Sequence, residues 1–132
     1  MHELSISEIL TRFKKVAVVG ISRQPFKISR QIAEYLEDNG FEVVGVNPAF
    51  TDADGIKVYP KLQDIPGEID IVNVFMRSEN IPEIIDDVIA KNPKVLWLQS
   101  GIRNDEAVKP VISKGIITIQ DRCIMIEHQS CL

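Results

Sequence analysis

Five short runs of mostly aliphatic residues recur along the chain, and each is apolar at nearly every position rather than at every second one. The runs are residues 16–20, 41–46, 71–75, 95–98 and 116–119. Strands that are covered on both faces need this continuous pattern, and a parallel sheet flanked by helices supplies the cover. The runs therefore predict five buried parallel strands.

Four other segments have the spacing of apolar residues that is typical of amphipathic helices. They are residues 6–13, 28–38, 79–91 and 105–113. Ser5 and Glu8 have the spacing of a capping box at the first of them, and Pro110 predicts that the last is kinked or shortened. The stretch 47–68 is too irregular for a long helix, and we expect only a short helical turn near 61–65.

The alternation of predicted strands and helices is typical of a doubly wound α/β domain, because crossovers between parallel strands are right-handed. We expect a three-layer Rossmann-like fold with a five-stranded parallel sheet in the order 3-2-1-4-5 and helices on both faces. No linker or internal repeat interrupts residues 1–132. The sequence therefore predicts a single domain.

Composition and charge narrow the classes of function. The formal net charge of −4 disfavours a nucleic-acid-binding surface, although a small local anion site is compatible with it. Cys123 and Cys131 are too few for a disulfide framework, and the two histidines, His2 and His128, stand in no metal-ligand spacing, so we expect no metal. Neither a membrane-spanning run nor a signal peptide is recognisable. These features predict a soluble, cytoplasmic protein.

In an open parallel sheet the ligand crevice lies beyond the carboxyl ends of the strands. The loop after the first predicted strand is the most informative, because it leads directly into a helix whose first amides have no partners within the helix. Gly20 permits close approach of a ligand, and Ser22, Arg23, Lys27 and Ser29 add donors or charge. The loop therefore predicts a diphosphate site. The alternative is that Gly20 only ends a strand and both cations lie in solvent.

Missing motifs limit the nucleotide that this loop could bind. Ser22 and Pro25 stand where the fingerprint G-x-G-x-x-G would need glycines. The second strand ends in Val46-Asn47-Pro48, without the carboxylate that would accept from the ribose of NAD. No Gly-Lys-Ser/Thr triplet of a P-loop occurs either. Nicotinamide redox chemistry is therefore disfavoured.

Catalytic candidates are few. Ser100 lacks the preceding glycine of a nucleophile elbow. Cys123 is the better candidate, because the adjacent Arg122 would favour its thiolate, but the apolar residues 124–126 fit a buried, inert cysteine better. We therefore favour a non-catalytic protein. Two alternatives are an enzyme of acyl-CoA or nucleotide chemistry that uses Cys123 or Ser100, and a protein-interaction module whose tail, 124–132, docks a partner.

An ordered set of motifs stands at the predicted strand ends. It consists of Val18-Val19-Gly20-Ile21-Ser22, Val46-Asn47-Pro48, Tyr59-Pro60 to Asp64-Ile65-Pro66, Trp97 to Ile102, and Asp121-Arg122-Cys123. From about residue 8 to 128, the chain with these motifs resembles the small stand-alone CoA-binding domain proteins. These are similar in turn to the amino-terminal CoA-binding domain of the succinyl-CoA synthetase alpha subunit.

The resemblance implies a Rossmann-like, nucleotide-binding domain that holds CoA or acyl-CoA through its ADP moiety, as a sensor, carrier or regulator. The positions that match the family's binding loops are Gly20, Ile21, Ser22, Arg23 and Gln24 at the diphosphate, Asn47 and Pro48 beside the adenosine, Phe75, Met76 and Arg77 after the third strand, and Gln99, Ser100 and Gly101 after the fourth. Cys123 aligns with a cysteine near the pantetheine end in the ligase domain.

The sequence also departs from the ligase pattern. Phe50 stands where the ligase domain has a lysine, so the contact to the 3′-phosphate must come from Arg23, Lys27 or Lys57, or be weaker. Ser100 replaces an acidic residue. The phosphorylated histidine and the nucleotide-grasp partner belong to another domain and another subunit, so we do not expect acyl-CoA synthesis by this chain alone. A partner protein, and either a monomer or a homodimer, are compatible with the sequence.

Overall fold

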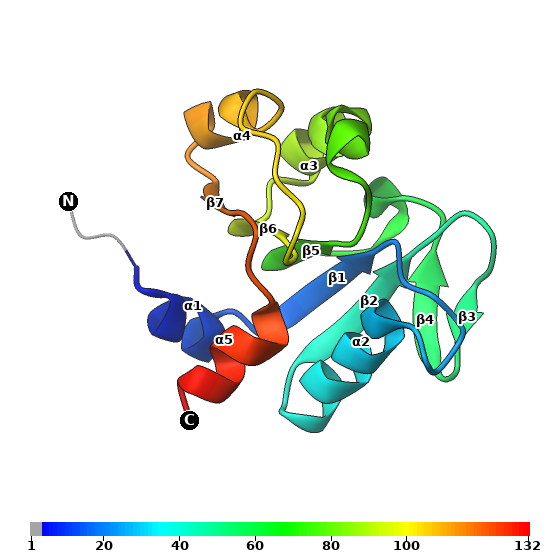
Figure 1. Cartoon of the computed structure of the whole chain (residues 1–132). Helices are drawn as coiled ribbons and strands as arrows, with labels where there is room; N and C mark the ends of the chain where they lie inside the picture. Colours follow the sequence, from blue (N-terminus) through cyan, green and yellow to red (C-terminus); the bar gives the residue numbers. More distant parts are fainter. Residues whose placement is uncertain (1–3) are drawn as a thin grey trace.

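A seven-stranded sheet separates two layers of helices in the computed structural model, which describes residues 4–132 (Figure 1). The strands are β1 (Lys15–Val19), β2 (Glu42–Val46), β3 (Asp52–Ala53), β4 (Ile56–Tyr59), β5 (Ile71–Val74), β6 (Val95–Leu98) and β7 (Ile117–Ile119). The helices are α1 (Ile6–Arg12), α2 (Ile28–Asp38), α3 (Ile85–Lys91), α4 (Lys109–Ser113) and α5 (Ile124–Ser130), with 3-10 segments η1 (Leu62–Asp64) and η2 (Ser78–Ile84). The predicted three-layer α/β fold is confirmed.

The number and order of the predicted strands are wrong. The observed order is β3-β4-β2-β1-β5-β6-β7, and every neighbouring pair is parallel except β3 and β4. The third predicted strand, β5, pairs with β1, whereas the sequence analysis places it beyond β2. That place belongs to β4, which forms within the stretch predicted to be irregular. With β4 counted, the six parallel strands follow the doubly wound order 3-2-1-4-5-6.

The helices agree with the sequence pattern except near prolines and at the carboxyl end. The capping box of Ser5 and Glu8 and the bounds of α2 are confirmed. The third predicted helix begins as the 3-10 segment η2, which contains Pro82, and becomes α-helical only at Ile85. Pro110 lies in the first turn of α4, so that helix is shortened as expected. Helix α5 is absent from the predicted set. Among the described residues, no helix is long and apolar enough to cross a membrane.

The buried core lies on both faces of the sheet. Helices α1, α2 and α5 cover one face, and α3 and α4 cover the other (Figure 1). Successive residues of β1 are buried alternately on the two faces: Val16 and Val18 belong to the cluster beneath α2, and Ala17 and Val19 to the cluster beneath α3. This double burial explains why the strand is apolar throughout.

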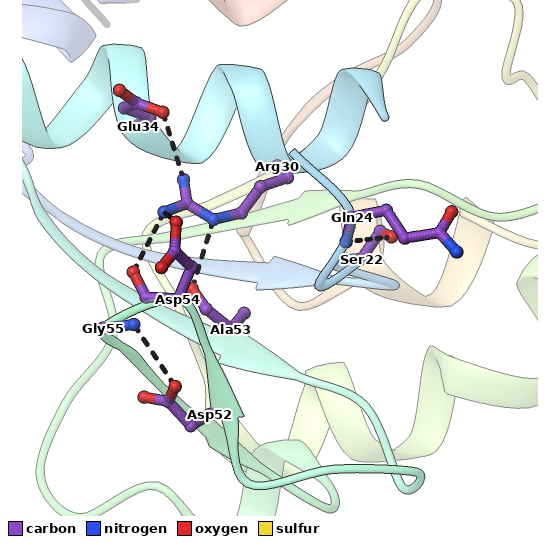
Figure 2. Close-up of polar contacts among 8 residues, drawn as sticks. All are labelled: Ser22, Gln24, Arg30, Glu34, Asp52, Ala53, Asp54 and Gly55. Atoms are coloured by element: carbon purple, nitrogen blue, oxygen red, sulfur yellow. Dashed lines mark hydrogen bonds and ion pairs between the residues drawn. The ribbon is translucent and has the colours of Figure 1, made fainter. Parts of the chain in front are cut away.

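Arg30 joins α2 to the hairpin of β3 and β4 (Figure 2). Its side chain is only 6% exposed, and its Nε and Nη2 donate to the backbone oxygens of Ala53 and Asp54, both at 3.1 Å. Ion pairs of 3.6 Å to the carboxylates of Glu34 and Asp54 complete its surroundings. The hairpin is therefore fixed against the amino-terminal half of α2, beside the loop that follows β1.

Candidate functional site

The loops that follow β1, β2, β5, β6 and β7 gather at one edge of the sheet, because the carboxyl ends of parallel strands lie together. The central strand β1 has β2 on one side and β5 on the other, so the chain leaves it at the point where strand order reverses. Ligands of open α/β sheets bind at such a point. The loop 20–27, which connects β1 to α2, occupies this place.

Gly20 brings the end of β1 against the loop after β5. Its φ of +86° lies in the left-handed region, and a Cβ at this position would stand 2.1 Å from the carbonyl oxygen of Phe75. Its amide donates to the carbonyl of Val46 at 2.9 Å, which ties the same residue to β2. Only glycine fits this junction, because any side chain would meet rigid backbone.

The loop after Gly20 is partly hydrogen-bonded to itself. The Ser22 amide donates to Ser29 Oγ at 3.0 Å. The Gln24 amide donates to Ser22 Oγ, also at 3.0 Å (Figure 2). The amides of Arg23, Ile28 and Ser29 have no hydrogen-bond partner among the residues that the structure describes. These donors stand in the loop and the first turn of an eleven-residue helix. Such groups favour an anion.

Lys27 precedes the first turn of α2 with an extended backbone, and its side chain makes no capping hydrogen bond. Its ammonium lies 5.8 Å from the ring centroid of the exposed Phe26. The guanidinium of Arg23 lies 4.8 Å from the ring centroid of Phe50. Phe50, where the resemblance leads us to expect a lysine, therefore holds a cation from another loop by a cation–π contact.

A cavity of about 340 Å³, here called the β2-side cavity, lies beside Gly20. Four of the predicted binding residues line it: Gly20, Asn47, Pro48 and Met76. Its other lining residues are Val19, Val46, Pro60, Lys61, Leu62, Glu83, Ile84 and Asp87. Four of these residues, Leu62, Glu83, Ile84 and Asp87, come from η1, η2 and α3, and they were not predicted because the packing of these segments against the strand ends is a tertiary feature.

A second cavity of about 540 Å³, here called the β6-side cavity, lies on the other side of the loop. Six of the predicted binding residues line it: Phe75, Met76, Arg77, Gln99, Ser100 and Cys123. Ile28, Ile102, Met125 and Ile126 complete the lining, and they were not predicted. Met76 lines both cavities, so the two spaces adjoin beside β5.

Several predicted residues are structural. The Asn47 amide donates from Nδ2 to the Ile21 carbonyl at 3.0 Å and accepts at Oδ1 from Ala49, which joins the loops after β1 and β2. The side chain of Ile21 is fully buried in the core. Gly101 lines neither cavity, and its amide donates to the carboxylate of Asp121. Ile21 and Gly101 shape the edge without facing the two cavities, whereas Asn47 lines the β2-side cavity and also holds the two loops together.

Gln99 is buried, with 4% of its surface exposed, yet it lines the β6-side cavity. Its Oε1 accepts from Asn73 Nδ2 at 3.0 Å and from the Ile124 amide at 2.9 Å. Its Nε2 has no hydrogen-bond partner within the described part of the chain. Gln99 therefore anchors the start of α5 and keeps donor capacity beside the cavity.

Cys123 is half-buried and directly precedes α5, at the border of the β6-side cavity. His128 lies five residues further along the chain and lines neither cavity; its Nδ1 is 2.6 Å from the Tyr35 hydroxyl. Burial, followed by the charge of Lys14, lowers the pKa of His128, and burial raises the pKa of Tyr35. His2 lies outside the described residues. In residues 4–132, no group of three or more His, Cys, Asp or Glu could hold a metal ion.

Comparison with known proteins shows the family to which the chain belongs. A model of the CoA binding domain family matches residues 14–129. The uncharacterized protein YneT of Bacillus subtilis is 41% identical over 123 residues, which are 93% of this chain and 91% of that protein. A hypothetical protein from Pyrococcus horikoshii has a solved structure with a TM-score of 0.91 at 36% identity, over 99% of both chains. The alpha subunit of the ADP-forming acetate–CoA ligase I of Pyrococcus furiosus is 27% identical over 92% of this chain, which spans 25% of that subunit.

Proposed function

Because this chain belongs to the CoA-binding domain family, we propose that it binds coenzyme A, free or acylated, at the loop between β1 and α2. One observation carries the proposal: amides without partners, at Arg23, Ile28 and Ser29, belong to the segment whose Gly20 lines one cavity and whose Ile28 lines the other, at the point where strand order reverses. A diphosphate needs such donors. The flanking cavities offer room for the two halves that a diphosphate joins in CoA.

The diphosphate is assigned to the loop 20–27 and the first turn of α2. The helix dipole and the free amides favour an anion there, and Arg23 and Lys27 add positive charge. The net charge of −4 does not oppose this, because charges separated by more than the Debye length of about 8–10 Å are largely screened.

The adenosine is assigned to the β2-side cavity. Pro48, Leu62 and Met76 offer apolar surface to a flat base, and the carboxylates of Glu83 and Asp87 can accept from its amino group. The 3′-phosphate is assigned to Arg23, whose guanidinium is held over Phe50. A bidentate guanidinium suits a phosphate, which compensates for the lysine that Phe50 replaces.

A sensor, carrier or regulator of CoA agrees with this site better than an enzyme does. His128 is hydrogen-bonded to Tyr35 and lies outside both cavities, so it is not placed to activate Cys123 or Ser100. Alkylation by iodoacetamide separates the two roles: we expect Cys123 to react no faster in the folded protein than in the denatured one. Abnormally fast labelling would favour the enzymatic alternative.

Isothermal titration of the whole chain with CoA, dephospho-CoA, ATP and NAD tests the proposal. We expect heat of binding with CoA, weaker binding of dephospho-CoA and none with NAD. The variant Arg23→Gln should bind CoA several-fold more weakly and no longer distinguish it from dephospho-CoA. Arg12→Gln, which neutralises an exposed arginine on α1, is the matched control and should behave as the parent. No heat with CoA at millimolar concentration would rule out the proposal.

A further inference from the structure

The β6-side cavity differs in chemistry from its neighbour. Its apolar lining consists of Ile28, Phe75, Met76, Ile102, Met125 and Ile126. Of the described residues around it, only Arg77 carries a charge, whereas Lys61, Glu83 and Asp87 all line the β2-side cavity. Its volume of about 540 Å³ is in the range of small-molecule sites. Such a space suits an apolar group rather than a nucleotide.

This cavity adjoins the site proposed for CoA. Ile28 has both a free backbone amide in the first turn of α2 and a side chain in the cavity wall. Met76 lines this cavity and the one assigned to adenosine. A ligand with its diphosphate on the α2 amides and its base in the β2-side cavity therefore directs its remaining arm toward the β6-side cavity.

Two further features indicate that the cavity binds part of a ligand. Gln99, with only 4% of its surface exposed, borders the space and has a spare Nε2 donor. This nitrogen is not among the fully buried side-chain atoms without a partner, so it is accessible from the cavity, and a ligand carbonyl can accept from it. At the rim, Ile28 and Ile126 leave 54% and 55% of their surfaces exposed to water. Covering them with an apolar chain would be favourable.

We infer that the β6-side cavity takes the acyl group of an apolar acyl-CoA, with Gln99 Nε2 donating to a carbonyl of the arm or thioester. The inference rests on the proposed CoA site and adds to it the class of acyl group. A neutral aliphatic chain fits the six apolar side chains. Within this cavity an acyl group that ends in a carboxylate would find only Arg77 to pair with and would lose hydration to the apolar wall.

Calorimetry of the whole chain with CoA, acetyl-CoA, butyryl-CoA and succinyl-CoA tests whether the cavity takes an apolar acyl group. We expect affinity to rise from CoA to butyryl-CoA by about three- to fourfold for each added methylene, the factor that ~0.8 kcal/mol per buried methylene gives. Succinyl-CoA, with as many acyl carbons as butyryl-CoA, should bind more weakly than butyryl-CoA. Equal affinity for CoA and butyryl-CoA, or tighter binding of succinyl-CoA, would overturn the inference while leaving CoA binding intact.

A pair of matched variants tests whether the acyl group binds in the β6-side cavity. Ile126→Asp places a carboxylate at the cavity rim, and we expect it to bring the ratio of butyryl-CoA to CoA affinity close to one. Ile112→Asp is the control, because Ile112 is equally exposed, at 55%, but lies on α4 and lines neither cavity. It should keep the parent ratio. An unchanged ratio in Ile126→Asp would contradict the assignment of the acyl group to this cavity.

Discussion

The hydroxyl of Ser29 accepts a hydrogen bond from the Ser22 amide at 3.0 Å, so the first turn of α2 holds the loop that leads into it. Ser22 in turn accepts from the Gln24 amide at 3.0 Å. These two hydrogen bonds pair two amides of the loop and fix its backbone. In this backbone the amides of Arg23 and Ile28 have no partner among the described residues. The phosphate site proposed here is therefore arranged before any ligand binds.

Replacing Ser29 by alanine should loosen this arrangement. Ser29 is 5% exposed, so the Ser22 amide would lose its acceptor in a largely buried place. We expect the free energy of unfolding in urea to fall by about 1 kcal/mol and the affinity for CoA to fall several-fold. Ser130→Ala is the control, because Ser130 is exposed at the end of α5 and donates to a backbone carbonyl of that helix. Unchanged affinity in Ser29→Ala would mean that the loop needs no such support.

Replacing Gly20 by alanine should affect both stability and binding. The new Cβ would stand 2.1 Å from the Phe75 carbonyl, in addition to the strain of a positive φ. Gly40→Ala separates these effects, because Gly40 has a similar φ of +88° but open space around it. We expect Gly40→Ala to lose about 1–2 kcal/mol and Gly20→Ala clearly more, with CoA binding reduced only in Gly20→Ala. Equal losses would show that Phe75 moves aside easily.

Arg30 should contribute more to the stability of the fold than its ion-pair partners do. In Arg30→Met the buried carbonyl of Ala53 and the partly buried carbonyl of Asp54 lose their donors, and we expect about 2 kcal/mol of stability to be lost. Glu34→Gln should cost less than about 1 kcal/mol, because the Glu34 side chain is 64% exposed and solvent screens its ion pair. Urea unfolding measures both. A larger loss for Glu34→Gln would contradict this account.

His128 should make stability depend on pH. Its imidazole lies between the rings of Tyr35 and Phe41, and burial together with Lys14 lowers its pKa below that of the unfolded chain. The unfolded chain therefore takes up the proton first, so stability is full above about pH 6.5 and falls as the pH drops from there through the folded pKa.

Unfolding free energies at about pH 7.5 and about pH 5.5 check this dependence. His128→Gln removes the titrating group, and we expect it to lose less stability on acidification than the parent does. The Tyr35 hydroxyl can bond to the introduced amide, which keeps the variant close to the parent structure. If both proteins lost the same stability between the two pH values, His128 would not be the group responsible.

The aliphatic runs predicted the buried strands because parallel strands covered on both faces leave little room for polar residues. They missed β4, whose four residues alternate between buried Ile56 and Val58 and more exposed neighbours. A signal was present: Asp54-Gly55, with φ of +53° and +93°, is a dipeptide of two-residue hairpins. The error in strand order followed from this omission, since β4 occupies the place beyond β2.

The strand-end rule predicted loops that line the two cavities but not all of the side chains that shape them. Gln99 contacts the Ile124 amide, 25 positions away, and no local pattern encodes that contact. Met125 and Ile126 line the cavity because they lie on α5, which was not predicted. In that helix buried Ile124 and His128 are four positions apart, a spacing that places them on one helix face. That spacing is the signal the sequence analysis overlooked.

The most direct measurement of the proposed phosphate site is an NMR titration of the isotope-labelled chain with CoA, following assigned backbone amides. The account predicts that the amides of Arg23, Ile28 and Ser29 shift most and to low field, as free N–H groups do when they bond to phosphate oxygens. Smaller changes are expected on α4, which lines neither cavity. Saturable binding of CoA with these amides unmoved, or with its largest shifts on α4, would contradict it.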